Sequence, residues 1–154
     1  MRLNIGDAAP DFSVADTDGV MRSLSDYQGS GLLLSFHRYA ACPMCNLHIH
    51  ELTVHWPELQ KSGLQILAVF MSDSNRVMDQ YAARDVPFPL AADPERLMYD
   101  AYGIEYSIPG MLKSFVHPRA MKAFFSASGM SSMATGVIRI SEIFMLPTAF
   151  QRIA

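Results

Sequence analysis

Two continuous apolar segments, at residues 32–37 and 64–71, constrain the fold of this chain most strongly. Apolar runs of this length are typical of strands that are buried on both faces of a sheet. A helical pattern of apolar residues follows each segment. The first pattern consists of Cys45, Ile49, Leu52, Trp56 and Leu59, and the second of Val77, Met78 and Tyr81. Strand, helix, strand, helix in this order predicts an α/β fold with parallel strands and right-handed crossovers.

Shorter elements are expected on either side of this unit. Residues 11–16 and 21–24 read as the two arms of a hairpin, with Gly19 in the turn. Asp93 followed by Pro94 is typical of a helix start, with Asp as the cap and Pro at the first helical position. Residues 148–153 are expected to form a last strand.

The first expected helix contains a proline, Pro57, within its apolar pattern. Pro57 removes one backbone donor and its ring clashes with the carbonyl group of Thr53, so we expect a kink there. Gly63 fits the position just past the end of the helix. A further helix is expected to open at Pro118.

Composition limits the class of protein. The chain has 154 residues, 50% of them hydrophobic and 18% charged, with a formal net charge of −3. This predicts one folded domain over residues 1–154 and excludes a disordered chain. An acidic balance without a basic cluster makes nucleic acid an unexpected partner. Without a signal-peptide pattern or an apolar run of about 18 residues, the expected location is the cytoplasm, with no membrane contact.

The only two cysteines, Cys42 and Cys45, stand three positions apart. A disulfide between them would close too short a loop to stabilise the fold much. In a chain without a secretory signal, this spacing indicates redox chemistry or a metal site.

The position of the pair favours redox chemistry. Cys42 is expected at or near the N-cap of the first helix, where the helix dipole favours a thiolate and lowers the thiol pKa. Pro43 suits the first helical turn, and Arg38 could lower the pKa further. Cys45 is expected one turn inside the helix, less exposed and within reach of Cys42. One sulfur can then attack a substrate while the other resolves the product.

Two alternatives from other classes remain open. Zinc could bind Cys42, Cys45, His48 and His50, although His50 should point away from the others on a continuous helix, which makes a tetrahedral site awkward. The domain could also be a catalytically idle interaction module. If the pair serves redox chemistry, His48, His50 and His55 are expected to be polar residues on the outer face of the helix.

Several segments resemble a known family. They are residues 6–12 (GDAAPDF), 16–19, 36–47 (FHRYAACPMCNL), 92–95 and 101–103. Together they are similar to the thioredoxin-fold peroxiredoxins of the alkyl hydroperoxide reductase/thiol-specific antioxidant (AhpC/TSA) family, in a branch that keeps a CPxC pair. The resemblance covers about residues 4–103 and about 144–150.

The resemblance implies a thioredoxin-like fold. Such a fold has a central mixed sheet flanked by helices, an N-terminal hairpin and, here, a helical insertion before a proline loop. Cys42 would be the peroxidatic thiol and Cys45 the resolving thiol, and Pro147 matches the proline that packs beside the active cysteine. Tyr39 and Ser35 stand where typical members have Thr and Pro. The chain is expected to be short at its C-terminus by comparison with the family.

The expected function is reduction of hydroperoxides by a Cys42 thiolate that Cys45 resolves. No metal or organic cofactor is expected, and a dithiol donor such as a thioredoxin or glutaredoxin would return the pair to its reduced form. A thiol–disulfide oxidoreductase that uses the same pair is the alternative, favoured by the CPxC spacing and by the absent Thr.

A homodimer is expected from the last strand. An uncovered strand at residues 148–153 would offer an edge for pairing with a second copy. The methionine-rich last third would add apolar surface to such a contact. In the alternative, residues 104–145 cover the edge and the protein is a monomer.

Overall fold

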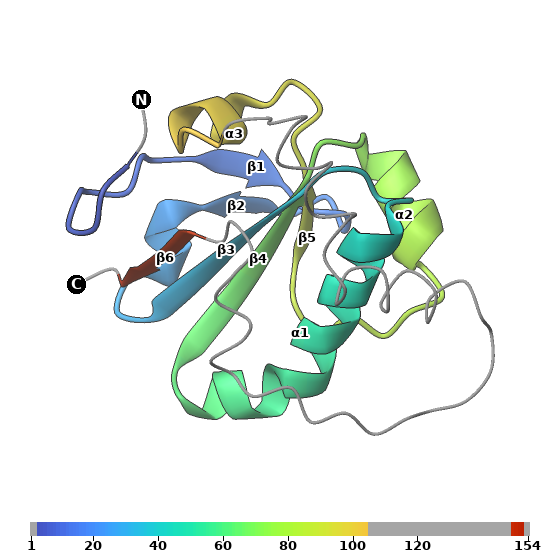
Figure 1. Cartoon of the computed structure of the whole chain (residues 1–154), viewed down its shortest axis with the longest axis horizontal. Coiled ribbons are helices and arrows are strands. Elements are labelled where there is room, and N and C mark those ends of the chain that lie inside the picture. The colour runs from blue at the N-terminus through green and yellow to red at the C-terminus, as the bar shows by residue number, and fades with distance from the viewer. Residues whose placement is uncertain (1–2, 105–148, 153–154) are drawn as a thin grey trace, which may run out of the picture.

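The computed structural model describes residues 3–104 and 149–152 of the chain (Figure 1). The elements follow one another in the predicted alternation of strands and helices. They are β1 (Ser13–Ala15), β2 (Met21–Ser23), the short 3-10 helix η1 (Leu24–Tyr27), β3 (Gly31–His37), α1 (Pro43–Lys61), β4 (Leu64–Phe70), α2 (Ser74–Tyr81), β5 (Leu90–Ala92), α3 (Leu97–Ala101) and β6 (Ala149–Arg152).

Four strands form the central sheet in the order β5-β4-β3-β6. β4 runs parallel to both β3 and β5, as crossover connections through helices require. β6 pairs antiparallel with β3, with Phe150 opposite Leu33. The sheet is therefore mixed, and the prediction of a last strand near the C-terminus is confirmed.

The N-terminal hairpin is a separate pair, β1 with β2, in antiparallel register. Gly19 in its turn has a φ of 78°, a conformation that favours glycine. The buried carboxylate of Asp16 accepts a hydrogen bond of 2.8 Å from Nε of Arg22 and so holds the two arms together. The N–H of Thr17 donates to the carbonyl oxygen of Leu90 at 2.8 Å, which fixes the hairpin beside β5.

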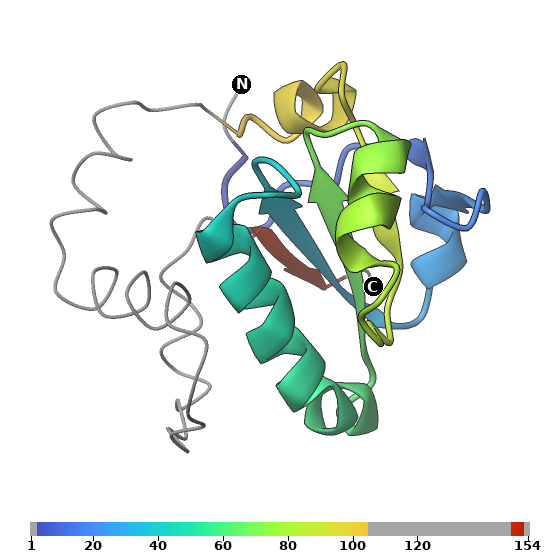
Figure 2. The same cartoon turned by 90° about the vertical axis from the view of Figure 1, so that its right-hand side faces the viewer.

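Each face of the sheet has its own apolar core, because successive side chains of a strand point to opposite faces. Helices α1 and α2 cover one face, where Leu33, Ile66, Ala68 and Phe70 of the strands meet Cys45, Ile49, Leu52 and Val77 of the helices. On the other face, Leu32, Leu34, Leu67 and Val69 meet Val14, Tyr27, Met98 and Tyr99. Figures 1 and 2 show α1 and α2 side by side on their face of the sheet.

Helix α1 runs through Pro57 and ends before Gly63, whose φ is 77°. The proline therefore lies inside the helix and does not end it, as predicted. Figure 1 shows the last turns of α1 leaving the direction of its first turns, as expected where a proline removes a backbone donor.

Helix α3 begins later than predicted. Residues 94–95 form a turn, Arg96 takes a left-handed φ of 63°, and the helix starts at Leu97. Asp93 still caps it, because its carboxylate accepts hydrogen bonds from the N–H groups of Leu97 at 2.9 Å and Met98 at 2.8 Å. The expectation that Pro94 occupies the first helical position is wrong: the chain makes a turn at residues 94–95 and reverses hand at Arg96, which brings the N–H groups of Leu97 and Met98 back to the Asp93 carboxylate.

We expect Asp93→Ala to lower the free energy of unfolding by about 1–3 kcal/mol, since two N–H groups at a buried helix start would lose their acceptor. The matched control is Asp73→Ala, which removes the exposed cap of α2 that accepts from Arg76 and should cost about 1 kcal/mol or less. Urea unfolding followed by circular dichroism measures both. Equal losses for the two variants would contradict the assigned role of Asp93.

Three expectations lie outside the described residues: the helical insertion opening at Pro118, the proline loop at Pro147, and the methionine-rich segment. Within residues 3–104 and 149–152, no helix is both long enough and apolar enough to cross a membrane.

Candidate active site

The loop between β3 and α1 is anchored to the end of β4. The carbonyl oxygen of Arg38 accepts a hydrogen bond of 2.9 Å from the N–H of Met71, and the N–H of Ala40 donates to Oγ of Ser72 at 3.0 Å. Ser72 and Ala40 are both buried. Two adjacent strands therefore fix the loop that delivers the chain into α1.

Both cysteines lie in the first turn of α1. Cys42 is the N-cap residue, Pro43 occupies the first helical turn, and the N–H of Cys42 donates to the carbonyl oxygen of Tyr39 at 2.9 Å. Cys42 is half-buried and Cys45 is 9% exposed, and both are free thiols. The predicted placement of the pair at the junction of strand and helix is confirmed.

The surroundings of Cys42 favour its thiolate. A hydrogen bond from the thiol of Cys45, followed by the backbone N–H groups of Cys45 and Met44 and the charge of Arg38, lowers the pKa of Cys42 to about 5, against the opposing effect of burial. The ordinary thiol pKa lies near 8.5. Cys42 therefore carries a negative charge at neutral pH and can act as a nucleophile.

Cys45 has the opposite character. Its hydrogen bond to Cys42 and its burial raise the pKa of the Cys45 thiol above the ordinary value. The same contact thus stabilises a thiolate on the more exposed sulfur and keeps the proton on the inner one. The two sulfurs are chemically unequal before any substrate arrives.

We expect the alkylation rate of Cys42 by iodoacetamide to rise with pH through about 5 and to be level above about pH 6.5, because the thiolate is the reactive form and its pKa is about 5. In Cys45→Ala the midpoint should move upward, since the largest stabilising contact is lost. Mass spectrometry of the modified residue measures the rate. A rate that is still climbing above pH 9 in the native protein would indicate an ordinary thiol.

The two positions at which the resemblance implies Thr and Pro, Tyr39 and Ser35, differ in burial. The Tyr39 side chain is 52% exposed, and the guanidinium carbon of Arg38 lies 5.9 Å from the centre of its ring. Ser35 is fully buried in β3, where its Oγ lies 2.9 Å from Nε2 of His37. No threonine hydroxyl stands at position 39 to orient a bound peroxide. Pro147, the other predicted site residue, lies outside the described residues.

One expectation about the helix is wrong. His48 is buried at 5% exposure, whereas His50 is exposed as predicted. His48 follows Cys45 by three positions and precedes Leu52 by four, so it belongs to the inner stripe of α1. The stripe itself would have revealed this, because position 48 falls within its width. His48 lies against His37, with ring centres 5.5 Å apart.

The alternative of a zinc site is not supported in the described part of the chain. There, no group of three or more His, Cys, Asp or Glu side chains is arranged to hold a metal ion.

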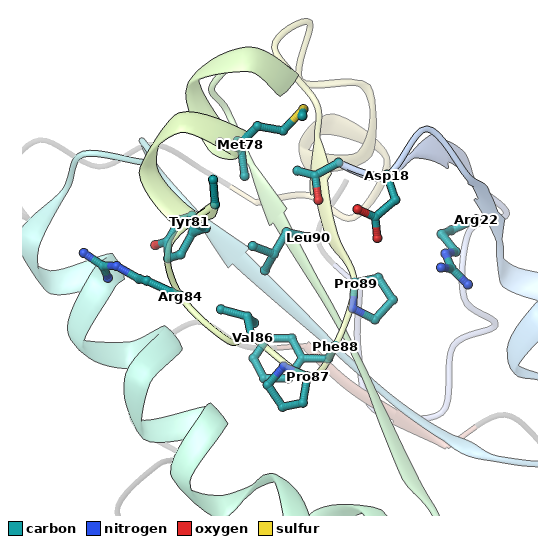
Figure 3. A pocket seen from close by; sticks show the side chains of 13 residues that line it. Asp18, Arg22, Met78, Tyr81, Arg84, Val86, Pro87, Phe88, Pro89 and Leu90 are labelled. Carbon is teal, nitrogen blue, oxygen red and sulfur yellow. The ribbon is translucent and has the colours of Figure 1, made fainter.

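A cavity of about 580 Å³ lies between α2, the segment before β5 and the N-terminal hairpin (Figure 3). Its walls include Tyr81, Phe88 and Arg84, and neither cysteine lines it. Arg84 in the cavity wall also contacts the first turn of α1. Its Nη1 donates at 3.3 Å to Oδ1 of Asn46, the residue that follows Cys45 in the sequence.

Comparison with known proteins gives consistent matches. The sequence model of the AhpC/TSA family matches residues 5–124. The chain is 30% identical to the peroxiredoxin Bcp of Escherichia coli over 118 residues, which cover 75% of this chain and 75% of that protein. It is 32% identical to the thiol-disulfide oxidoreductase ResA of Geobacillus thermodenitrificans over 101 residues, which cover 65% of this chain and 58% of that protein.

Among solved structures, the peroxidoxin BcpB of Mycobacterium tuberculosis superposes with a TM-score of 0.62 at 20% identity, covering 67% of this chain and 68% of that one. This similarity establishes the thioredoxin-like α/β fold. The chain spans less than two thirds of the length of the ResA relative.

Proposed function

The chain belongs to the AhpC/TSA family, and on that basis we propose that it is a thiol-dependent enzyme that reduces hydroperoxides through Cys42 and Cys45. One observation carries the proposal: a half-buried thiol at a helix N-cap, with its pKa lowered to about 5, accepts a hydrogen bond from a second, buried thiol. A ready nucleophile and an internal partner for the oxidised product therefore lie together.

In the first step, the Cys42 thiolate attacks one oxygen of the hydroperoxide. A sulfur–oxygen bond forms, the oxygen–oxygen bond breaks, and the alcohol leaves after taking a proton, so that Cys42 becomes a sulfenic acid. In the second step, the sulfur of Cys45 attacks the sulfur of Cys42 and water leaves. The two cysteines have then lost two electrons in forming the disulfide, and the peroxide has gained them.

A dithiol protein would return the disulfide to two thiols by exchange. We propose a thioredoxin or glutaredoxin for this role, because the cycle needs two electrons delivered through thiols. No metal or organic cofactor enters either step. The cytoplasm, where thiols are kept reduced, suits such a cycle, and we propose it as the location.

The second candidate function is thiol–disulfide exchange, in which Cys42 attacks a disulfide and Cys45 releases the mixed disulfide. Two features favour it. The two cysteines share one helical turn, so Cys45 can reach a mixed disulfide on Cys42, and the exposed Tyr39 stands where a threonine hydroxyl would orient a peroxide. Both functions use the same sulfurs in the same roles.

Thiol titration after one equivalent of hydrogen peroxide tests the proposal. We expect rapid loss of two thiols per chain, compared under the same conditions with the rate on oxidised glutathione. Faster reaction with the peroxide supports the peroxidase, and faster reaction with the disulfide supports exchange. No reaction with either would show that the pair is idle.

We also propose a homodimer. Among the described strands β6 pairs with β3 alone, which leaves its other side for a second chain. Sedimentation velocity at micromolar concentration should show a species of twice the 17.1 kDa chain mass. A single species of the chain mass, unchanged by dilution or by oxidation, would contradict the dimer.

A further inference from the structure

Two buried histidines lie on the sheet face that α1 covers. His37, the last residue of β3, is 4% exposed and His48 of α1 is 5% exposed. Their ring centres are 5.5 Å apart at an interplanar angle of 44°. Buried polar side chains are costly unless they are hydrogen-bonded, so each of these imidazoles calls for a reason.

His37 has a structural reason. Its Nε2 lies 2.9 Å from Oγ of Ser35, and its ring stacks on Phe70 with centres 4.9 Å apart. Burial, and secondarily the neighbouring His48, lowers the pKa of His37 to about 3. His37 is therefore neutral and already engaged.

His48 has no such partner. Within the described part of the chain, neither its Nδ1 nor its Nε2 makes a hydrogen bond. Oε2 of Glu51 lies 3.7 Å from Nδ1, which is longer than a hydrogen bond but close enough to stabilise a positive charge on the ring. Of the two buried imidazoles, His48 is the one with an open acceptor nitrogen.

Helix geometry places this imidazole beside the resolving thiol. Cys45 and His48 are both buried and stand three residues apart on α1, a spacing that puts Cβ atoms about 5–6 Å apart on one face. Side chains of a helix generally lean toward its N-terminus, which for His48 is the direction of the turn that holds Cys45. The titratable groups in contact with the His48 ring are His37 from β3 and Glu51 from α1 itself.

We infer that His48 accepts the proton of the Cys45 thiol when Cys45 attacks the oxidised Cys42. This role rests on the proposed function, since it presumes that Cys45 is the resolving thiol. A buried thiol that keeps its proton must lose it to become a nucleophile, and the thiol lies too deep to release it readily to water.

The step balances in both versions of the chemistry. The S–H bond of Cys45 breaks and His48 becomes imidazolium, while a sulfur–sulfur bond forms between Cys45 and Cys42. With a sulfenic acid, the sulfur–oxygen bond breaks and the leaving hydroxide takes the proton from His48 as water. With a mixed disulfide, a thiolate leaves and His48 returns its proton to that thiolate or to solvent.

The aromatic disulfide 5,5′-dithiobis(2-nitrobenzoate) separates the two steps on the full-length reduced protein. Attack by Cys42 releases one coloured thiolate, and attack by Cys45 on the mixed disulfide releases a second. Stopped-flow absorbance gives both rates. The variants are His48→Gln, which keeps a polar side chain, and His48→Phe, which keeps a ring to pack against His37. His50→Gln, an exposed histidine of the same helix, is the matched control.

We expect both His48 variants to leave the first release within about twofold of the native rate and to slow the second about 100-fold at pH 7, the usual scale of general-base assistance. Between pH 7 and pH 9 the second release should depend more steeply on pH in the variants than in the native protein, because the Cys45 proton, held by a raised pKa, is then removed by hydroxide alone. His50→Gln should match the native protein in both releases.

Unchanged second releases with unchanged pH dependence would overturn the role of His48, and so would an equal loss of both releases, which marks a structural effect. Restoration of the native rate by His48→Phe alone would assign the residue to packing and would overturn it as well. Failure of the native protein to give any first release would instead count against the proposed function of Cys42.

Discussion

Replacement of Cys42 by serine is expected to reduce turnover of both hydroperoxide and disulfide substrates to the uncatalysed level. The thiolate is the group that forms the new bond in either reaction, and a serine hydroxyl stays protonated at neutral pH. Cys45 cannot take over this role. The pKa of Cys42 is lowered to about 5, whereas the Cys45 thiol is buried and keeps its proton.

The measurement is steady-state peroxide consumption with a dithiol donor in excess, together with the first release from the aromatic disulfide. The control is the far-ultraviolet circular dichroism spectrum, which should not change because a serine at the N-cap is a favourable helix start. Residual turnover above about one tenth of the native rate would mean that another nucleophile carries the reaction, and would displace Cys42 from its role.

The sequence predicted the part of the fold that positions the cysteines. Two long apolar strands and a helical stripe between them admit few arrangements, because both faces of the strands and one face of the helix must be buried. The junction of β3 and α1 then follows from chain connectivity, and Pro43 marks where the helix starts. The two cysteines could therefore be placed in the first turn of α1 from the sequence.

Details that depend on side chains meeting across the sheet were not predictable in the same way. The hydrogen bond between the two thiols depends on the rotamers of the first helical turn, and the pinning of Ala40 by Ser72 joins residues 32 positions apart. The late start of α3 depends on Arg96 adopting a left-handed φ, a conformation that a non-glycine side chain rarely takes. Periodicity carries no signal for any of these.

The burial of His48 changes which side chains belong to the site. On the outer face, as the sequence predicted, His48 would be one of several solvated histidines of the helix. Placed on the inner stripe between Cys45 and Leu52, it becomes a titratable group one turn from the inner thiol, facing His37. The two thiols and this imidazole then follow one another at intervals of three residues in the first turns of α1, from the half-buried Cys42 to the buried Cys45 and His48.

Replacement of Cys45 by serine is expected to leave the first chemical step intact and to block the second. Cys42 should still react with one equivalent of hydrogen peroxide, but the product should persist as a sulfenic acid that a 1,3-dione reagent labels, because no internal thiol remains to displace it.

Turnover with a dithiol donor should fall about 100-fold or more, since an external thiol lacks the high effective concentration of a neighbour in the same helical turn. The serine hydroxyl still offers a donor to Cys42, so the lowered pKa of Cys42 and its fast oxidation at neutral pH should be kept, in contrast to Cys45→Ala. Mass spectrometry of the labelled protein and the steady-state rate measure the two effects together, with native protein giving an internal disulfide and no label. Turnover at the native rate in this variant would show that Cys45 does not resolve the oxidised Cys42.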